Sequence, residues 1–202
     1  LRYTCKNGTD LLLELPEGHI WLGGEESSKD GTIFNANIPT EEVFSAPQYN
    51  GVNGIVYSTK PLIYHGNTIS DFSFTFKEGK IVDYTAKEGY EVLKELIETD
   101  EGSLYLGEVA LVDHFSPISQ SNQIFYETLF DENASCHLAI GASYPTCLKN
   151  SDGLSEEELK ERGLNYSLTH VDFMIGHEHM NIKGYTRDGQ EVDIMIDGRL
   201  QV

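Results

Sequence analysis

The sequence predicts an α+β fold in which a mixed, largely antiparallel β-sheet carries a few flanking helices. Segments typical of strands fill roughly the first eighty residues and return towards the end of the chain. Helical periodicity is confined to a few stretches between them. Because strands and helices do not alternate regularly, a parallel βαβ architecture is not expected.

The first part of the chain contains short strands and one clear hairpin. Residues 11–15 and 19–23 are short apolar runs. In residues 71–76, phenylalanine occupies every second position, so three rings share one face of an extended segment. A Lys-Glu-Gly-Lys turn joins this segment to residues 81–85, which predicts an antiparallel hairpin.

Helical signals occur in three places. Apolar residues between Tyr90 and Ile97 recur at helical spacing opposite acidic ones, which predicts an amphipathic helix of about three turns. We expect a second helix at residues 122–130. Ser155 and Glu158 form a capping-box pattern that opens a short charged helix.

The second half of the chain returns to strands. Residues 103–112, 136–142 and 167–176 are largely apolar and strand-like. Residues 185–200 predict a second hairpin that turns at Asp188-Gly189. With no tandem repeat or Pro/Ser-rich linker, residues 1–202 are expected to form a single domain.

The formal net charge of −19 restricts the kinds of partner. Nucleic acids and anionic membrane surfaces require clustered Lys and Arg, so we expect neither as a partner. A strongly acidic chain suits divalent cations or amine-bearing substrates, although acidity also serves solubility alone. No apolar run approaches the ~18 residues of a membrane-spanning helix.

The first residues of the chain and its three cysteines indicate where in the cell the protein is expected. The first residues lack the apolar core of a secretory signal, and Leu1 stands in place of an initiator Met, so a fragment is expected. Cys5, Cys136 and Cys147 are odd in number and show no CxxC spacing. We therefore expect free thiols in a reducing, cytoplasmic protein. Three Asn-x-Ser/Thr sequons, including those at Asn133 and Asn165, are interpreted as chance matches.

Several familiar catalytic motifs are absent. The sequence contains neither GxxxxGK[ST] nor GxGxxG, so a glycine-rich phosphate loop has no support. It also lacks the GxSxG elbow of serine hydrolases and the HExxH motif of zinc proteases. A site of another kind must therefore come from dispersed residues.

Two pairs of metal-capable side chains lie close together in the sequence. His170 and Asp172 are two residues apart in an apolar strand, so both project to one face, where they can reach the same ion. A hydrogen-bonded core pair is the alternative. His177 and His179 repeat the spacing but follow Gly176 into a loop-rich stretch, so we interpret them as a solvated loop.

Further polar residues occupy apolar or constrained positions. Glu108 and His137 lie in apolar strands, where an ionisable group requires a partner. Glu41 and Glu42 are adjacent carboxylates between apolar segments, and a helix N-terminus is their alternative role. Tyr144 is held between a glycine and a proline, and a packed turn aromatic is its alternative role. Mixed carboxylate and imidazole ligation suits zinc, cobalt or manganese, and these groups suffice for two ions.

Four blocks of sequence, taken together, resemble one family. They are residues 37–47, 107–112, 125–145 and 170–176, and they run through most of the chain in the family's order. The chain is thereby similar to the C-terminal metal-binding domain of the aminopeptidase T / aminopeptidase S family of metalloaminopeptidases. The family's enzymes are about twice as long, with an N-terminal domain that precedes this half.

The resemblance implies a site with two divalent metal ions. Its ligands would be Glu42, Glu108, His137, His170 and Asp172, and Tyr144 would be a catalytic side chain. The choice of Glu42 over Glu41 rests on the resemblance alone. The family also implies a homodimer.

The function expected from these observations is release of N-terminal residues from peptides by metal-activated water. In this hypothesis Glu41, or a carboxylate beside it, accepts the proton of the water, and Tyr144 donates to the developing oxyanion. Two alternatives stay open: hydrolysis of another bond, such as a phosphoester, and a catalytically idle fragment without its N-terminal domain.

Overall fold

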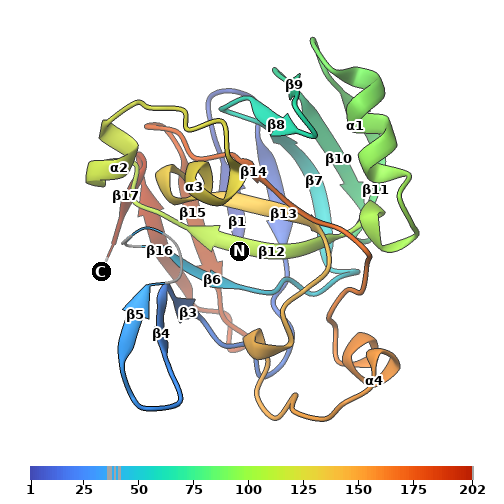
Figure 1. Cartoon of the computed structure of the whole chain (residues 1–202), viewed down its shortest axis with the longest axis vertical. Coiled ribbons are helices and arrows are strands. Elements are labelled where there is room, and N and C mark those ends of the chain that lie inside the picture. Colours follow the sequence, from blue (N-terminus) through green and yellow to red (C-terminus); the bar gives the residue numbers. More distant parts are fainter. Residues whose placement is uncertain (36–37, 39, 41, 202) are drawn as a thin grey trace.

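The larger sheet forms one layer of the molecule. The computed structural model describes residues 1–35, 38, 40 and 42–201. Within them, eight strands pair in the order β11-β10-β7-β2-β1-β15-β16-β17 (Figure 1). These strands are β1 (Arg2–Thr4), β2 (Asp10–Leu13), β7 (Val52–Tyr57), β10 (Ser73–Lys77), β11 (Lys80–Thr85), β15 (Asn181–Tyr185), β16 (Glu191–Ile196) and β17 (Arg199–Leu200).

A second sheet of five strands has the order β14-β13-β12-β6-β3. Its strands are β3 (Leu22–Gly23), β6 (Val43–Ser45), β12 (Leu106–Leu111), β13 (His137–Gly141) and β14 (His170–Met174). Two separate hairpins are formed by β4 (Glu25–Ser27) with β5 (Ile33–Asn35) and by β8 (Leu62–Tyr64) with β9 (Asn67–Ile69). All strand pairs among the described residues are antiparallel.

The helices are short and flank the sheets, which confirms the α+β class. They are α1 (Tyr90–Ile97), α2 (Pro117–Gln120), α3 (Thr128–Asp131) and α4 (Glu156–Glu161), with 3-10 turns η1 (Gly102–Leu104), η2 (Glu132–Ala134) and η3 (Pro145–Cys147). In the described part of the chain, each helix is too short or too polar to cross a membrane.

The core lies between the two sheets. The alternating phenylalanines predicted to share a face, Phe72, Phe74 and Phe76, are all buried there. The ring of Phe173 on β14 lies 5.2 Å from the ring of Phe74 and 5.8 Å from that of Phe72. Aromatic contacts between rings at such distances add to the free energy gained by burying apolar area. Phe173 therefore packs the smaller sheet against the larger one.

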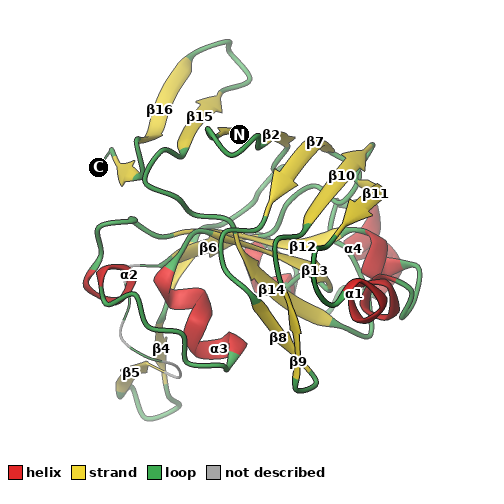
Figure 2. Ribbon diagram, turned by 90° about the horizontal axis from the view of Figure 1, so that it is seen from above, coloured by secondary structure: helices red, strands yellow, loops and turns green. Residues whose placement is uncertain are grey.

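The opposite face of the five-stranded sheet carries polar side chains. In β13 and β14, Leu138, Ile140 and Phe173 face the core, and the residues between them point away from it. A β-bulge between Leu106 and Glu108 shifts the register of β12, so that Glu108 also points away from the core. Figure 2 shows α2 and α3 on this side of the sheet, away from β2, β7 and β10.

Most sequence-predicted elements occur, with different bounds. Ser155 and Glu158 form the capping box at the start of α4. The first hairpin joins β10 to β11, and the second joins β15 to β16 through a turn with Gly189 at φ +84°. The strand predicted at 103–112 begins with η1, so that β12 starts only at Leu106. The amphipathic helix α1 spans eight residues, about two turns instead of three.

The helix predicted at residues 122–130 is wrong for most of its length. Only α3 is helical there, because Asn122 and Tyr126 adopt positive φ angles of 53° and 58°. A buried carboxylate, Asp131, accepts the backbone N–H groups of Phe125 and Glu127 on either side of Tyr126. This local side-chain bonding replaces the helical hydrogen bonds that the apolar spacing suggested.

We expect the substitution Phe173→Ala to lower the free energy of unfolding by about 3–5 kcal/mol, because it opens a cavity between the two sheets. Urea unfolding followed by circular dichroism measures this loss. As a control, Val82→Ala, at a side chain 57% exposed on β11, should change the same quantity by less than about 0.5 kcal/mol. Equal losses in both variants would contradict this account of the core.

Candidate metal centre

The polar face of the smaller sheet brings together all five sequence-predicted ligands. Glu42 directly precedes β6, and Glu108 lies in the middle of β12. His137 is the first residue of β13, and His170 and Asp172 both belong to β14. Glu41, the expected proton acceptor, lies outside the described residues.

Strand register aligns the candidate ligands over small residues. Ala139 pairs with Glu108 on one side and with Asp172 on the other. His137 pairs with Ala110, and His170 with Gly141. Directly paired residues on one face have Cβ atoms about 4.5–5.5 Å apart. Small side chains between the candidate ligands therefore leave room above the sheet.

Glu108 is the centre of the arrangement. Its Oε1 lies 3.3 Å from Nε2 of His137, and its Oε2 lies 3.5 Å from Nε2 of His170. The remaining carboxylates complete two neighbouring groups. Glu42 Oε1 is 3.8 Å from His137 Nε2, and Asp172 Oδ1 is 3.5 Å from His170 Nε2. One carboxylate thus faces both imidazoles, each through a different oxygen.

Backbone carbonyls orient both imidazoles. His137 Nδ1 lies 3.0 Å from the carbonyl oxygen of Ser135, and His170 Nδ1 lies 2.7 Å from that of Ala142. A carbonyl can only accept, so each Nδ1 carries the hydrogen and donates it. Each Nε2 is then directed at the carboxylates, as in histidines that bind a metal through that nitrogen.

A sixth residue, Glu132, joins the cluster without having been predicted. It lies in η2, next to α3, and offers a carboxylate oxygen that groups with His137 and Asp172. The sequence contains no periodicity or spacing that distinguishes Glu132 from its acidic neighbours. Only its place inside the 125–145 block could have drawn attention to it.

Concentrated negative charge raises the affinity of this cluster for protons. Burial alone disfavours the imidazolium form of His137, but the hydrogen bond to Glu108 and the charge of Asp172 raise its pKa to about 10. For His170, burial is likewise outweighed by Asp172 and Glu108, and its pKa is raised to about 9.

Two acids in the cluster show related effects. Burial, followed by the charge of Asp172, raises the pKa of Glu132 to about 9. Burial also raises the pKa of Glu42, against the attraction of His137. Without a cation, protons therefore compensate the carboxylates.

The residues fit divalent cations. Asp172 Oδ1 is fully buried and accepts no well-formed hydrogen bond within the described residues, although His170 Nε2 lies 3.5 Å away. A buried carboxylate oxygen without such a bond is costly unless a cation supplies the missing interaction. Asp172 belongs to two of the three overlapping groups in which candidate ligand atoms all lie within 4.8 Å of one another. Their oxygen and imidazole donors suit zinc, cobalt or manganese.

Tyr144 lies at the edge of the cluster. Its ring is 4.7 Å from the ring of His170, and 46% of the residue is exposed. Burial of the hydroxyl, followed by the charge of Glu108, raises its pKa to about 12. Tyr144 therefore keeps its proton at neutral pH and can donate a hydrogen bond beside the ligands.

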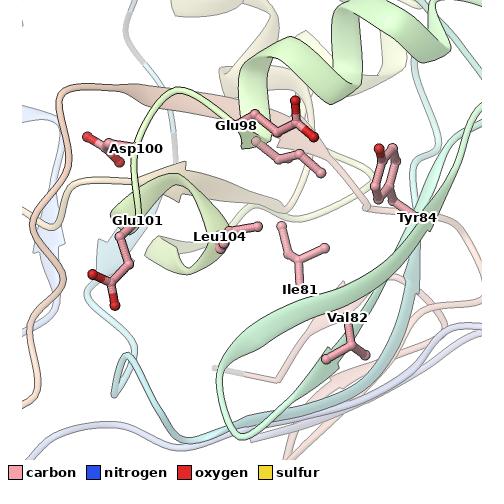
Figure 3. A pocket seen from close by; sticks show the side chains of 8 residues that line it. Ile81, Val82, Tyr84, Glu98, Asp100, Glu101 and Leu104 are labelled. Carbon is pink, nitrogen blue, oxygen red and sulfur yellow. The ribbon is translucent and has the colours of Figure 1, made fainter.

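Other features lie apart from this cluster. His177 and His179 lie after the end of β14, as predicted, but both are half-buried instead of solvated, and the backbone N–H of His179 donates to His177 Nδ1. A pocket of about 490 Å³ beside α1 (Figure 3) contains none of the six cluster residues. It is lined by Ile81, Val82, Tyr84, Ile97, Glu98, Asp100, Glu101 and Leu104.

The chain is similar to a known protease family and to solved structures. The model of the thermophilic metalloprotease (M29) family matches residues 1–200. Aminopeptidase 2 of Geobacillus stearothermophilus is 56% identical over 191 residues, which are 95% of this chain and 46% of that protein. Aminopeptidase T of Thermus thermophilus is 44% identical over 95% of this chain and 47% of that protein.

Among solved structures, wild-type AmpT from Thermus thermophilus matches with a TM-score of 0.92 and 42% identity, over 100% of this chain and 49% of that one. A 2,5-dihydroxypyridine dioxygenase from Pseudomonas putida matches with a TM-score of 0.62 at 13% identity, over 99% and 54% of the two chains. That likeness concerns the fold alone. The chain spans about half the length of the curated relatives it matches.

The raised pKa values predict how the stability of the metal-free chain depends on pH. Glu132, His137 and His170 bind protons more tightly in the folded state than in the unfolded state. Their contribution to the free energy of unfolding is therefore fully present below their unfolded pKa values. This stabilisation is lost as the pH rises through their folded-state pKa values of about 9 to 10. Calorimetry after chelation should show a Tm that falls between pH 6.5 and 10 more steeply than in His170→Gln. An equal slope in both proteins would contradict this assignment.

Proposed function

The chain belongs to the thermophilic metalloprotease (M29) family, and on that premise we propose that its cluster is the catalytic centre of a metalloaminopeptidase. The observation that carries the proposal is Glu108, whose two oxygens face the imidazoles of His137 and His170. The names of the relatives support the reaction class. In this proposal the chain is the metal-bearing part of a longer enzyme.

Charge balance favours two divalent cations. With both imidazoles neutral and Glu42, Glu108, Glu132 and Asp172 ionised, the cluster carries four negative charges, which two such ions neutralise. One ion would be held by Glu42, Glu108 and His137, the other by Glu108, His170 and Asp172. Glu132 would contribute a further carboxylate oxygen to the ion beside His137 or to the ion beside Asp172. When bound, such ions lower the pKa of water and polarise a carbonyl.

The chain's own side chains complete the proposed reaction. The protonated hydroxyl of Tyr144, beside His170, donates a hydrogen bond to the oxygen of the substrate carbonyl as negative charge develops there. Glu41, or a carboxylate beside it, accepts the proton of the attacking water and passes it to the leaving amine. Backbone carbonyls at Ser135 and Ala142 keep the two imidazoles in place throughout.

The proposed substrates are peptides with a free N-terminus. The cluster is rich in carboxylates, and an unblocked α-amine is attracted by such a surface or binds a cation. This attraction confines cleavage to the first residue. We further propose a cytoplasmic protein, since its three cysteines are free thiols, and a homodimer, as the family resemblance implies.

We expect His170→Ala and Glu108→Gln to abolish metal-dependent hydrolysis of aminoacyl anilides, because each removes a ligand of the cluster. The measurement is steady-state hydrolysis by the whole protein that carries this chain, with cobalt(II) or zinc(II) added. His179→Ala, in the turn outside the cluster, is the matched control and should retain normal rates.

Three results would count against the proposal. Near-normal turnover by both cluster variants would refute the assignment of the site. Hydrolysis of phosphoesters in preference to anilides would favour a different metal-dependent hydrolase. Bound metal without hydrolysis of any substrate, by both the chain and the whole protein, would favour a catalytically idle role.

We expect Tyr144→Phe to lower kcat by about 10²–10³-fold, the effect typical of losing one oxyanion donor. KM and metal content should change little, since the ring remains and the hydroxyl is not one of the grouped ligands. Anilide kinetics together with elemental analysis test this. A loss confined to KM would assign Tyr144 to substrate binding instead.

A further inference from the structure

The buried side-chain amide of Asn165 forms hydrogen bonds to two chain segments next to the candidate site. Asn165 is only 6% exposed, although it lies between β13 and β14 in a connecting segment. Its Nδ2 donates to the carbonyl oxygens of Gly141, at 2.7 Å, and Gly102, at 2.8 Å. Because this nitrogen is buried and bonded to two carbonyls, the sequon at Asn165 is not open to a glycan, which agrees with its interpretation as a chance match.

The backbone of Asn165 is also bonded to the same segment. Its N–H donates to Ser143 Oγ at 3.1 Å, and its carbonyl accepts the N–H of Ser143 at 2.8 Å. Residues 141–143, which begin at the last residue of β13, are thus held from one side by a single residue. Between them, Ala142 donates its N–H to the carbonyl of Thr169.

Residues 141–143 in turn determine the positions of two site residues. The carbonyl of Ala142 accepts the Nδ1–H of His170 at 2.7 Å. Tyr144 follows Ser143 directly in the chain. On the other side, the segment packs against β12 at Gly107, where a Cβ atom would come within 2.2 Å of the Ala142 oxygen. Glu108, the next residue, therefore lies beside the same contact.

We propose that Asn165 is a positioning residue for His170 and Tyr144. It touches neither side chain itself. Its amide holds the Gly141 carbonyl, its backbone holds Ser143, and the Ala142 carbonyl between them sets the orientation of the His170 imidazole. This inference rests on the proposed function for its effect on catalysis, but its effect on metal affinity can be measured separately.

The substitutions Asn165→Ala and Asn165→Asp test the proposal. Alanine removes both side-chain donors, and aspartate keeps the shape but replaces them with an acceptor that faces two carbonyls. Loss of an outer hydrogen bond typically weakens metal affinity or activity by about 10–100-fold. We expect both variants to bind cobalt(II) about 10–100-fold more weakly, measured by competition with a chromophoric chelator, and to lose kcat by a similar factor with a smaller change in KM.

Two comparison variants separate positioning from stability. Thr9→Val removes a buried acceptor for the N–H of Tyr57 in the larger sheet, so it should lower Tm while cobalt affinity and kcat stay unchanged. Ser143→Ala removes only the bond from the Asn165 N–H and should weaken cobalt binding by a few-fold. It keeps the test available if the Asn165 variants fail to fold.

The outcomes are distinct. Asn165 variants that bind cobalt(II) within about twofold of the unsubstituted protein, despite a lower Tm, would overturn the proposal, as would an unchanged affinity in Ser143→Ala if the Asn165 variants do not fold. Absence of anilide hydrolysis by the unsubstituted, cobalt-loaded protein would instead contradict the proposed function. The cobalt titrations still decide the role of Asn165 in that case.

Discussion

The gathering of four carboxylates and two imidazoles, all buried or half-buried, over one face of a sheet is the constraint on which the rest of this structure depends. Isolated charges of this kind cannot be buried cheaply, and a paired charge loses its compensation when its partner is removed. In the metal-free protein, protons on His137, His170 and Glu132 provide that compensation, which is why their pKa values are raised. Divalent cations, in the proposed function, take the place of these protons.

The scaffold meets this constraint with strand register and close backbone contacts. Ala139 lies between Glu108 and Asp172 in adjacent strands, so the ligands stand side by side without bulk between them. On the opposite face of the sheet, Phe173 packs against the larger sheet, and the polar face is therefore built on a rigid core. Carbonyls at Ser135 and Ala142 fix the imidazoles, and in our proposal Asn165 holds the two residues on either side of Ala142.

Local patterns predicted much of the fold because they report which face of a strand is buried. The alternation around Phe74, the turn before β11 and the capping box of α4 all act within a few residues. The expected helix at 122–130 failed because the carboxylate of Asp131 bonds the backbone on both sides of Tyr126 and stabilises a conformation that apolar spacing does not encode.

The candidate site could be predicted from the sequence to a similar extent. The two-residue spacing of His170 and Asp172 encodes a shared face, and apolar neighbours distinguish this pair from His177 and His179. Pairing between β12, β13 and β14, which unites Glu108 with both histidines, is a long-range property that the residues alone left open. Glu132 reaches the cluster from a turn, where no periodicity marks it.

The most direct test is to locate cobalt(II) by anomalous X-ray scattering in crystals of the protein soaked with that ion. The account predicts two cobalt positions that share Glu108, one beside Glu42 and His137 and the other beside His170 and Asp172. A single position, or cobalt bound only at His177 and His179, would contradict it.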